Sequence, residues 1–215
     1  MNPKFSDSKQ PVVLYRNPIS GHCHRVQLML SLLDIPVELH DLDMSNGAHK
    51  APDFLLKSPL GKVPAIDDNG VLLADSNAIC VYLIKTYGDD YPWLPDSPLE
   101  AAEVQRWLSI AAGEIAYGPC AVRLVKVFGV ELDYKAARGI TEHLFKMMET
   151  HLTKQHFLAG NRISLADVAA FSYVAHVPEG CVSLEPYSSI RSWIKRIEAQ
   201  PRFVPMAASP LPDAV

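Results

Sequence analysis

Two short motifs in the first half of the chain carry residues that suit the binding of a small peptide. Residues 61–65 have the sequence Gly-Lys-Val-Pro-Ala, and Asp75 and Ser76 follow soon afterwards. A proline that opens a strand leaves Val63 with an N–H and a C=O that the sheet does not use. If the Val63–Pro64 bond is cis, that pair faces outward and can hold an extended peptide. Asp75 and Ser76 at a helix start offer a dipole and a hydroxyl to a carboxylate. The two motifs therefore predict a receptor for a small acidic peptide with a free α-carboxylate.

The composition is typical of a globular protein of a reducing compartment. The chain has 215 residues, of which 48% are hydrophobic, and a net charge of -4, with a pI of about 6.0. This size allows a full hydrophobic core. The lysines and arginines are scattered and form no basic cluster, which argues against binding of nucleic acid. Residues 1–11 lack the apolar centre of a signal peptide, and no run of about 18 apolar residues indicates a membrane span. We expect a cytoplasmic, soluble protein.

The first part of the chain alternates short strands and helices. Apolar alternation and turn residues predict strands at 12–15, 37–42, 64–67 and 71–73, and helices at 21–33, 51–57 and 76–87. A crossover helix between the first two strands implies that they pair in parallel. Asp68, Asn69 and Gly70 predict a hairpin turn between the last two. The order βαβ, helix, ββα is that of a thioredoxin-like domain, which we place at residues 11–87.

The remainder of the chain is predicted to be helical. Residues 88–98 contain three prolines and are predicted to form a linker. Strand signals then nearly vanish, and helical periodicity indicates helices at 99–117, 120–128, 134–152, 164–177 and 189–199. Ser164 and Asp167 are predicted to form a capping box. The fold class is therefore α/β plus all-α, with a helical bundle at residues 99–215 whose tail after Gln200 wraps the surface.

In this order, the motifs resemble those of cytosolic glutathione transferases over nearly the whole chain. Residues 14–26 are similar to the first strand, active-site loop and helix of that family, and residues 47–52 to a glutathione-contact segment of its phi-type, serine-using members. Residues 61–65 and the pair Asp75 and Ser76 resemble the remaining glutathione elements, and residues 163–167 the capping box of the helical domain. Two positions depart from the pattern. Lys62 stands where phi enzymes usually carry Gln, and Asp75 where many members carry Glu.

The resemblance implies binding roles for residues of both motifs. Val63, before Pro64, would pair its backbone with the cysteinyl residue of glutathione. Ser76 would take the γ-glutamyl carboxylate, and Asp75 would lie near the ammonium. The cationic side that holds the glycyl carboxylate would consist of His49, Lys50 and Lys62. For each of these residues, a helix cap, a solvated lysine or a polar loop remains the structural alternative.

Conjugation requires the glutathione thiolate, because the thiol is a poor nucleophile. A free thiol with a pKa near 8.5 is only about 3% ionised at pH 7. Lowering that pKa by roughly two units ionises about three quarters of it and requires about 2.7 kcal/mol of selective anion stabilisation. Ser20, which precedes the first helix, is predicted to donate its hydroxyl to the sulfur while the helix dipole adds favourable potential. A simple N-cap is its alternative role.

Two other side chains compete with Ser20. Tyr15 ends the first strand, where other transferase classes carry a catalytic tyrosine, although strand alternation makes a packing role equally plausible. Cys23 falls where the second cysteine of a thioredoxin motif would lie, and a first-turn thiolate could form a mixed disulfide with glutathione. Its helical spacing to Val26 favours a buried, inert thiol. Arg25 is expected to pair with a carboxylate in the loop or at the surface.

Other chemistry has little support in the sequence. Four cysteines occupy no zinc or C-x-x-C spacing, and the histidines that flank Cys23 have no complementary ligands, so we expect no metal. Tyr117 and Arg123, together with Phe128, are candidates for an electrophile pocket, with core packing as the alternative for Tyr117 and Phe128. The resemblance implies a homodimer with Leu60 near the twofold axis.

The predicted function is conjugation of glutathione, as co-substrate and without a further cofactor, to hydrophobic electrophiles. Two alternatives stay open. One is a glutathione-dependent disulfide oxidoreductase that uses Cys23 or bound glutathione itself, and the other is a non-catalytic glutathione-binding scaffold.

Overall fold

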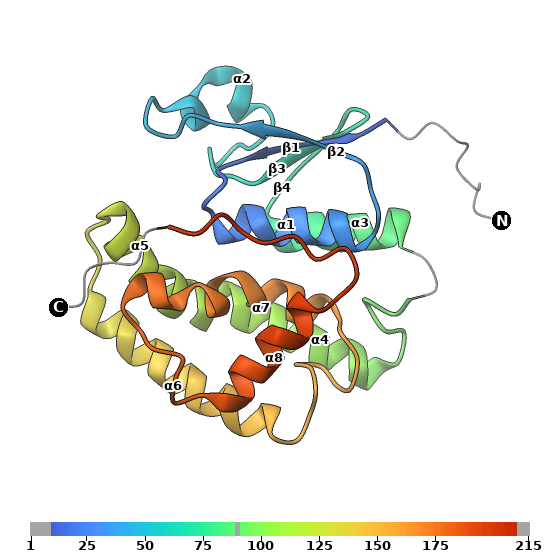
Figure 1. The fold of residues 1–215 in the computed structure, drawn as a ribbon. Coiled ribbons are helices and arrows are strands. Elements are labelled where there is room, and N and C mark those ends of the chain that lie inside the picture. Colours follow the sequence, from blue (N-terminus) through green and yellow to red (C-terminus); the bar gives the residue numbers. More distant parts are fainter. Residues whose placement is uncertain (1–9, 89–90, 210–215) are drawn as a thin grey trace.

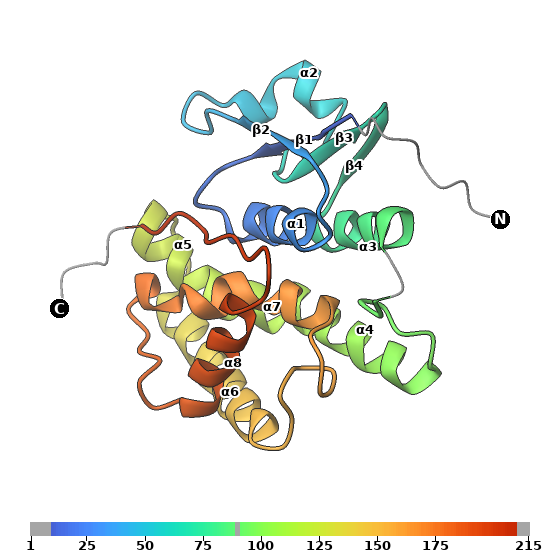
Figure 2. The same cartoon turned by 45° about the vertical axis from the view of Figure 1, so that its right-hand side comes forward.

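The computed structural model describes residues 10–88 and 91–209 (Figure 1). The predictions made above for residues 1–9, for linker positions 89–90 and for the tail at 210–215 lie outside the described residues. The chain folds into a sheet-containing N-terminal half and a helical C-terminal half, and α1 and α3 lie between the sheet and the helices of the C-terminal half (Figures 1 and 2).

The N-terminal half contains a four-stranded sheet in the order β2-β1-β3-β4. The strands are β1 Val12–Arg16, β2 Val37–Asp41, β3 Ala65–Asp68 and β4 Val71–Ala74. The predicted parallel pairing of β1 with β2 is confirmed, while β3 pairs antiparallel to both β1 and β4. The predicted hairpin is also confirmed, since Asn69 and Gly70 have positive φ values of 52° and 90° as a two-residue turn of this type requires.

Helices cover both faces of this sheet. Helices α1 Gly21–Leu32 and α3 Ser76–Tyr87 pack on one face, and the short α2 Pro52–Leu55, preceded by the 3-10 turn Ala48–Lys50, lies on the other (Figure 1). The alternation along β1 explains this arrangement. Val12 and Leu14 are buried in the core, whereas Tyr15 contacts Phe54 of α2 with 6.1 Å between ring centroids. The α/β half therefore has the predicted thioredoxin-like architecture.

The helical half consists of the elements α4 Pro98–Ala112, α5 Ala121–Phe128, α6 Tyr134–Leu152, α7 Leu165–Ala175 and α8 Ser188–Glu198. The sequence predicts separate helices for the first two, but they run on through a π-helical turn, Ala116–Cys120, that contains Pro119. Extra residues in such a turn accommodate the proline without ending the helix. The stretch 98–128 has the length and hydropathy of a membrane span, and half of its most apolar window is buried inside the fold.

Helix α7 is the centre of the helical half and connects it to α1. Its predicted capping box is confirmed, because Ser164 accepts from the helix backbone and the Asp167 carboxylate accepts from the Ser164 N–H at 2.9 Å. Asp167 also accepts from the indole of Trp193 at 2.8 Å, and it is fully buried. Satisfied buried polar groups of this kind specify one packing arrangement, and here they fix the start of α7 to α8 through Trp193, while the helix also packs against α1 and α4.

The tail that follows α8 is more buried than the surface segment that the sequence predicts. Residues 201–209 run along α1, between it and the helical half (Figure 1). His24 Nε2 donates to the Val204 carbonyl oxygen at 2.8 Å, and Ser31 Oγ donates to the Arg202 carbonyl oxygen at 2.6 Å. Met206 and Ser209 are buried. The described part of the tail therefore joins the two halves.

Candidate active site at the start of two helices

Ser20 caps helix α1 at the end of a tightly bonded loop. Its Oγ accepts from the Cys23 N–H at 3.4 Å, and its own N–H donates to the Asn17 carbonyl at 3.0 Å. The Asn17 side chain accepts from the Ile19 N–H at 3.1 Å. A hydroxyl has two lone pairs and one proton, so capping uses an acceptor position and leaves the proton to donate. The capping role and the predicted catalytic role of Ser20 are therefore compatible.

The first turn of α1 packs directly on the helical half. A Cβ atom on Gly21 would lie 2.8 Å from the Tyr173 ring, which is closer than side chains approach one another. The Tyr173 hydroxyl in turn accepts from the His22 N–H at 3.3 Å. Gly21 therefore lets α7 approach the helix N-terminus, and the direction of the first-turn amides depends on both halves of the chain.

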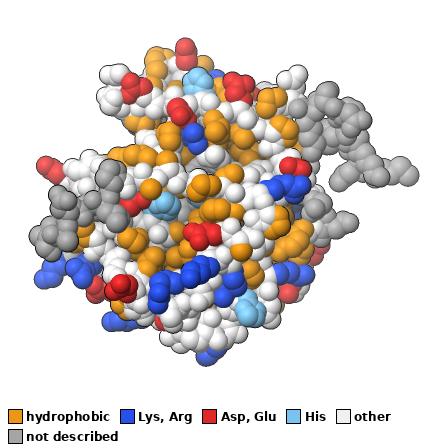
Figure 3. All heavy atoms as spheres, in the orientation of Figure 1, with side chains coloured by type: hydrophobic (Ala, Val, Ile, Leu, Met, Phe, Trp, Pro, Cys, Tyr) orange, Lys and Arg blue, Asp and Glu red, His pale blue; other side chains and the backbone are white. Residues whose placement is uncertain are grey.

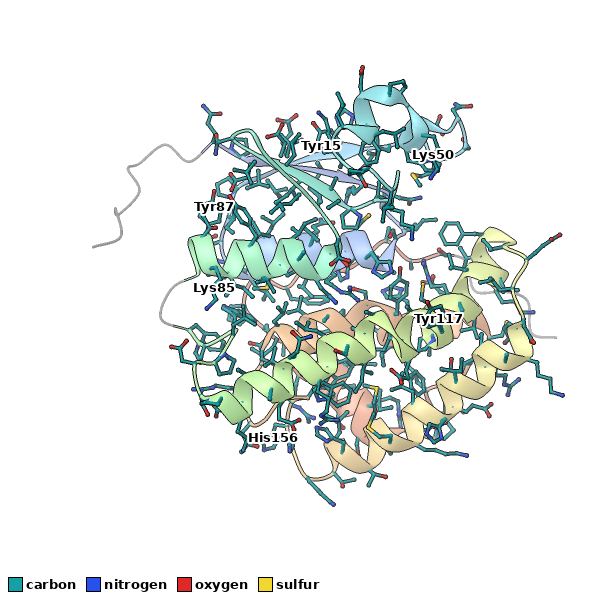
Figure 4. All side chains as sticks on the ribbon, turned by 180° about the vertical axis from the view of Figure 1, so that it is seen from behind. Tyr15, Lys50, Lys85, Tyr87, Tyr117 and His156 are labelled. Carbon is teal, nitrogen blue, oxygen red and sulfur yellow. The ribbon has the colours of Figure 1, made fainter. Side chains whose placement is uncertain are left out.

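The structure places the two competitors of Ser20 in different surroundings. Tyr15 lies on the α2 side of the sheet, away from α1, with its ring 5.1 Å from the His40 ring (Figure 4). Cys23 is 1% exposed and accepts from the Asn17 N–H at 3.4 Å. Burial raises the pKa of the Cys23 thiol to about 11, although the hydrogen bonds from Ser20 and Asn17 act in the opposite direction. A thiol with this pKa is protonated at neutral pH.

The backbone at Val63 has the predicted form. The Val63–Pro64 bond is cis, and Val63 is half-buried. Among the hydrogen bonds within residues 10–88 and 91–209, none uses the Val63 N–H or its carbonyl. The neighbouring Lys62 differs, because its N–H and carbonyl both bond to Ser58 Oγ, at 3.2 and 2.7 Å. The main chain of Val63 is thus available to an extended peptide, as the sequence predicts.

The start of α3 brings Asp75 and Ser76 together in a constrained geometry. Asp75 has a φ of 76°, which is unusual for a residue with a side chain, and its Oδ1 accepts from the N–H groups of Asn77 and Ala78 at 3.0 and 2.9 Å. Ser76 is 4% exposed, and its Oγ accepts from Arg25 Nη1 at 2.7 Å. Among the described residues, the second Asp75 oxygen has no hydrogen-bond donor, and the acceptor nearest to the Ser76 hydroxyl proton is His22 Nδ1, 3.3 Å from Ser76 Oγ.

Sequence reasoning did not find the role of Arg25. The expectation of a carboxylate partner is wrong, because Arg25 is 1% exposed and forms no ion pair within the described residues. Its other partners are neutral, namely Asn77 Oδ1 at 3.0 Å and the carbonyl oxygen of Ala169 in α7. Burial lowers the pKa of Arg25, and the nearby Asp75 carboxylate is among the groups that raise it. The guanidinium therefore supplies positive potential next to Ser76 and is bonded directly to no carboxylate among the described residues.

His22 was also missed as a site residue. Its Nδ1 lies 3.4 Å from Arg25 Nη1, and its ring packs edge-on against Tyr173 at 4.9 Å. Burial, followed by the positive charges of Arg25 and Lys62, lowers the pKa of His22 to about 3. His22 is therefore neutral near pH 7, and the positive charge around it comes from Arg25 and Lys62. Its position beside Cys23 was the one signal for it in the sequence.

The three residues of the predicted cationic side have different surroundings. Lys50 Nζ donates to the carbonyl oxygens of Leu60 and Gly61 at 3.3 and 3.1 Å, so it fastens the loop before Lys62. His49 Nδ1 is buried without a hydrogen-bond partner among the described residues, and Lys62 is exposed. Lys62 is therefore accessible to a ligand, His49 has an unsatisfied ring nitrogen, and Lys50 has a structural task.

The two candidates for an electrophile pocket are not alike. Tyr117 is 69% exposed in the π-helical turn and lies on the same side of the molecule as Lys50 (Figure 4). Arg123 is 1% exposed, and its guanidinium is occupied by Glu179, the Ile19 carbonyl and Ser209. The expectation that Arg123 lines a pocket is therefore corrected, because an ion pair of this kind leaves no nitrogen facing a ligand.

Cavities and metal ligands do not explain the site. Three cavities of about 350, 390 and 460 Å³ are lined by other residues, and none of the predicted site residues is among them. Hydrophobic side chains gather along the boundary between the two halves on the face shown in Figure 3. Within the described residues there is no cluster of three or more His, Cys, Asp or Glu side chains that could hold a metal ion. The predicted ligand-binding groups are instead main-chain and hydroxyl groups at the starts of α1 and α3.

A thioredoxin-like half joined to an all-helical half, with a serine at the start of α1 and a free main-chain edge before a cis-proline, defines the class of protein. Residues 14–91 match the glutathione S-transferase N-terminal domain and residues 115–201 the glutathione S-transferase C-terminal domain. The chain belongs to the glutathione S-transferase family.

Individual relatives agree with this assignment. The chain is 31% identical to glutathione S-transferase 3 of Zea mays, covering 94% of this chain and 96% of that protein. It is 33% identical to the probable glutathione S-transferase GSTF2 of rice, with coverage of 95% and 99%. Among solved structures, a glutathione S-transferase from Pseudomonas fluorescens superposes with a TM-score of 0.85 at 28% identity, covering 92% of this chain and 99% of that one. A Drosophila mojavensis homologue with bound glutathione gives 0.80 at 25% identity, covering 89% of each chain.

Proposed function

We propose that this transferase binds glutathione along the edge formed by Val63 and the start of α3, and that Ser20 stabilises its thiolate for attack on apolar electrophiles. The observation that carries the proposal is the geometry of Ser20. Its Oγ accepts from the Cys23 N–H, so its proton is left to donate at the positive end of α1.

The binding mode follows from groups that the fold leaves unused. The cysteinyl residue of glutathione pairs with the N–H and carbonyl of Val63, which form no hydrogen bond within the described chain. The γ-glutamyl carboxylate accepts from the Ser76 hydroxyl, whose oxygen is held by Arg25 at 2.7 Å. The γ-glutamyl ammonium donates to Asp75, and the glycyl carboxylate meets His49 and Lys62. A Drosophila mojavensis homologue of the same fold has bound glutathione, which supports glutathione as the ligand.

The energy required for thiol activation is within reach of these groups. A pKa decrease of roughly two units requires about 2.7 kcal/mol. A hydrogen bond to a charged group contributes about 1.5–3 kcal/mol, and a helix N-terminus adds about 0.3–1 kcal/mol. The thiolate sulfur then attacks an electrophilic carbon and forms the S–C bond. With an aryl halide, halide departs with the bonding electrons, and with an enone, the developing enolate takes up a proton from water.

The proposal extends to the electrophile, the oligomeric state and the domain bounds. The electrophile is apolar and lies near Tyr117, whose ring is largely exposed on the helical half. Leu60 is 75% exposed and is proposed as a contact between two copies of the chain in a cytoplasmic homodimer. Glutathione is the co-substrate, and the reaction as proposed requires no other cofactor. Residues 11–87 and 99–215 are proposed as the two domains, joined by residues 88–98.

Two substitutions at Ser20 test the proposal. Ser20→Ala removes both the hydroxyl and the cap, whereas Ser20→Gly removes the hydroxyl and costs only a few tenths of a kcal/mol as a cap. We expect both variants to lower kcat/KM with aryl halides and enones by about 10²–10³-fold and to raise the pKa of bound glutathione, measured by thiolate absorbance.

Two outcomes would contradict the proposal. Wild-type protein that binds glutathione but leaves its thiol pKa near the solution value would be a binding scaffold. Full activity in both Ser20 variants would exclude Ser20 as the group that stabilises the thiolate.

A further inference from the structure

We propose that Arg123, a residue of the helical half, is a positioning residue for thiol activation because it fixes the peptide group that carries Ser20. This inference rests on the role of Ser20 proposed above. Arg123 Nη1 donates to the Ile19 carbonyl oxygen at 2.7 Å. That carbonyl belongs to the same planar peptide group as the Ser20 N–H.

Both ends of the Ile19–Ser20 peptide group are held. The Ser20 N–H donates to the Asn17 carbonyl at 3.0 Å, which is a contact within the loop. The Ile19 carbonyl is held by Arg123 alone among the hydrogen bonds of residues 10–88 and 91–209. Among the described residues, this Arg123–Ile19 hydrogen bond is also the one that joins the helical half to loop residues 17–20. Because the peptide plane cannot rotate without breaking one of these bonds, the starting direction of the Ser20 side chain depends on Arg123.

Arg123 is itself held in one orientation. Its Nε donates to Glu179 Oε2 at 2.6 Å and its Nη2 to Ser209 Oγ at 3.1 Å, so three nitrogens have three different partners. Glu179 is fixed in turn by His176 Nδ1 at 2.7 Å and by the Ser209 N–H at 3.2 Å. The side chains of Arg123 and Glu179 are 2% and 5% exposed. Ser209, in the described part of the tail, thus bonds both Arg123 and Glu179.

The role of Arg123 is geometric rather than electrostatic. Glu179 balances its charge within the buried pair, so little net positive potential is left to act on a thiolate. A planar guanidinium can satisfy three partners in fixed directions, which the ammonium of lysine cannot do. A displacement of about 1 Å at a reacting group costs as much as about 10²-fold in rate, so loosening the Ile19 carbonyl is expected to affect catalysis.

The test compares Arg123→Met and Arg123→Lys with Arg138→Met, a control that breaks an exposed Arg–Glu pair of the same half. We expect Arg123→Met to raise the pKa of bound glutathione by about one unit, which lowers kcat/KM about tenfold at a pH below both pKa values. Arg123→Lys should behave similarly, with KM for glutathione within about threefold of wild type. Arg138→Met should match wild type in all three measurements.

A second variant keeps the inference testable if Arg123→Met does not fold. Ser209→Ala removes one partner of the Arg123 guanidinium without changing any charge, and it should shift the thiol pKa in the same direction by a smaller amount. Folded Arg123→Lys and Ser209→Ala proteins with the wild-type thiol pKa and pH profile would overturn the inference and leave the proposed function intact. A wild-type protein without a lowered thiol pKa would overturn both.

Discussion

Arg25 Nη1 lies 2.7 Å from Ser76 Oγ, and this buried hydrogen bond joins α1 to α3 at the proposed γ-glutamyl site. The guanidinium has no ion-pair partner among the described residues and also bonds to α7 through the Ala169 carbonyl. Since the Ser76 oxygen accepts from Arg25, the Ser76 hydroxyl proton is directed elsewhere. Arg25 therefore orients a ligand-binding hydroxyl and adds positive potential where a carboxylate is proposed to bind.

Replacement of Arg25 should weaken glutathione binding more than it slows the chemical step. We expect Arg25→Met to raise KM for glutathione about tenfold, equivalent to about 1.4 kcal/mol, with kcat changed less than about threefold. Arg106→Met is the control, because Arg106 pairs with Glu103 at the surface. Steady-state kinetics and calorimetric glutathione binding check the prediction. An unchanged KM with a strongly reduced kcat would show that Arg25 acts on the thiol rather than on the carboxylate.

Cys23 should be dispensable for glutathione chemistry. Burial raises the pKa of its thiol to about 11, so almost none of it is thiolate at neutral pH. We expect Cys23→Ala to keep wild-type conjugation and disulfide-exchange rates within about threefold, which is within the range of a small packing defect. Alkylation at pH 7.5, followed by mass spectrometry, should modify the exposed Cys181 well before Cys23. Loss of disulfide exchange in Cys23→Ala would instead favour the oxidoreductase alternative.

Acid should destabilise the fold through His24. This side chain is 2% exposed between Ser172 Oγ and the Val204 carbonyl, each at 2.8 Å from one ring nitrogen. Burial, together with His176 and Arg16, lowers its pKa to about 4, while the Val204 bond acts in the opposite direction. Unfolded His24, with an ordinary pKa of about 6.5, binds a proton at a higher pH than the folded form does.

The His24 contribution to stability is therefore fully present above pH 6.5 and is lost as the pH falls towards 4. For a shift of about 2.5 units, the free energy of unfolding should fall by about 3 kcal/mol across this range. Denaturant titrations between pH 4 and 7 check this, and His24→Gln should make the free energy of unfolding depend less steeply on pH. His22, whose pKa is lowered to about 3, titrates in the same direction and remains in that variant. If the free energy of unfolding depends on pH as steeply in His24→Gln as in wild type, the acid destabilisation belongs to other groups.

Local patterns in the sequence account for the elements and for the order of the site motifs. The bounds of α3 and α6 follow from helical periodicity, and the turn at Asn69 and Gly70 follows from the backbone preferences of two residues. Ser164 and Asp167 lie within one helical turn, so their capping box is visible in the chain. Such features depend on neighbours a few positions apart, and tertiary packing reinforces them.

The surroundings of long polar side chains are different, because they depend on residues that only folding brings near. Arg25 contacts Ser76 from 51 positions away and the Ala169 carbonyl from 144 positions away. Arg123 reaches Ile19 across 104 positions and Ser209 across 86. An arginine has the same charge and the same donors in any sequence, so its type does not reveal whether it is solvated, paired or buried. The sequence by itself determined the fold, the family and the ordered motifs of the site. The tertiary structure decided which residues hold those motifs in place, because burial and long-range hydrogen bonds exist only once the two halves pack together.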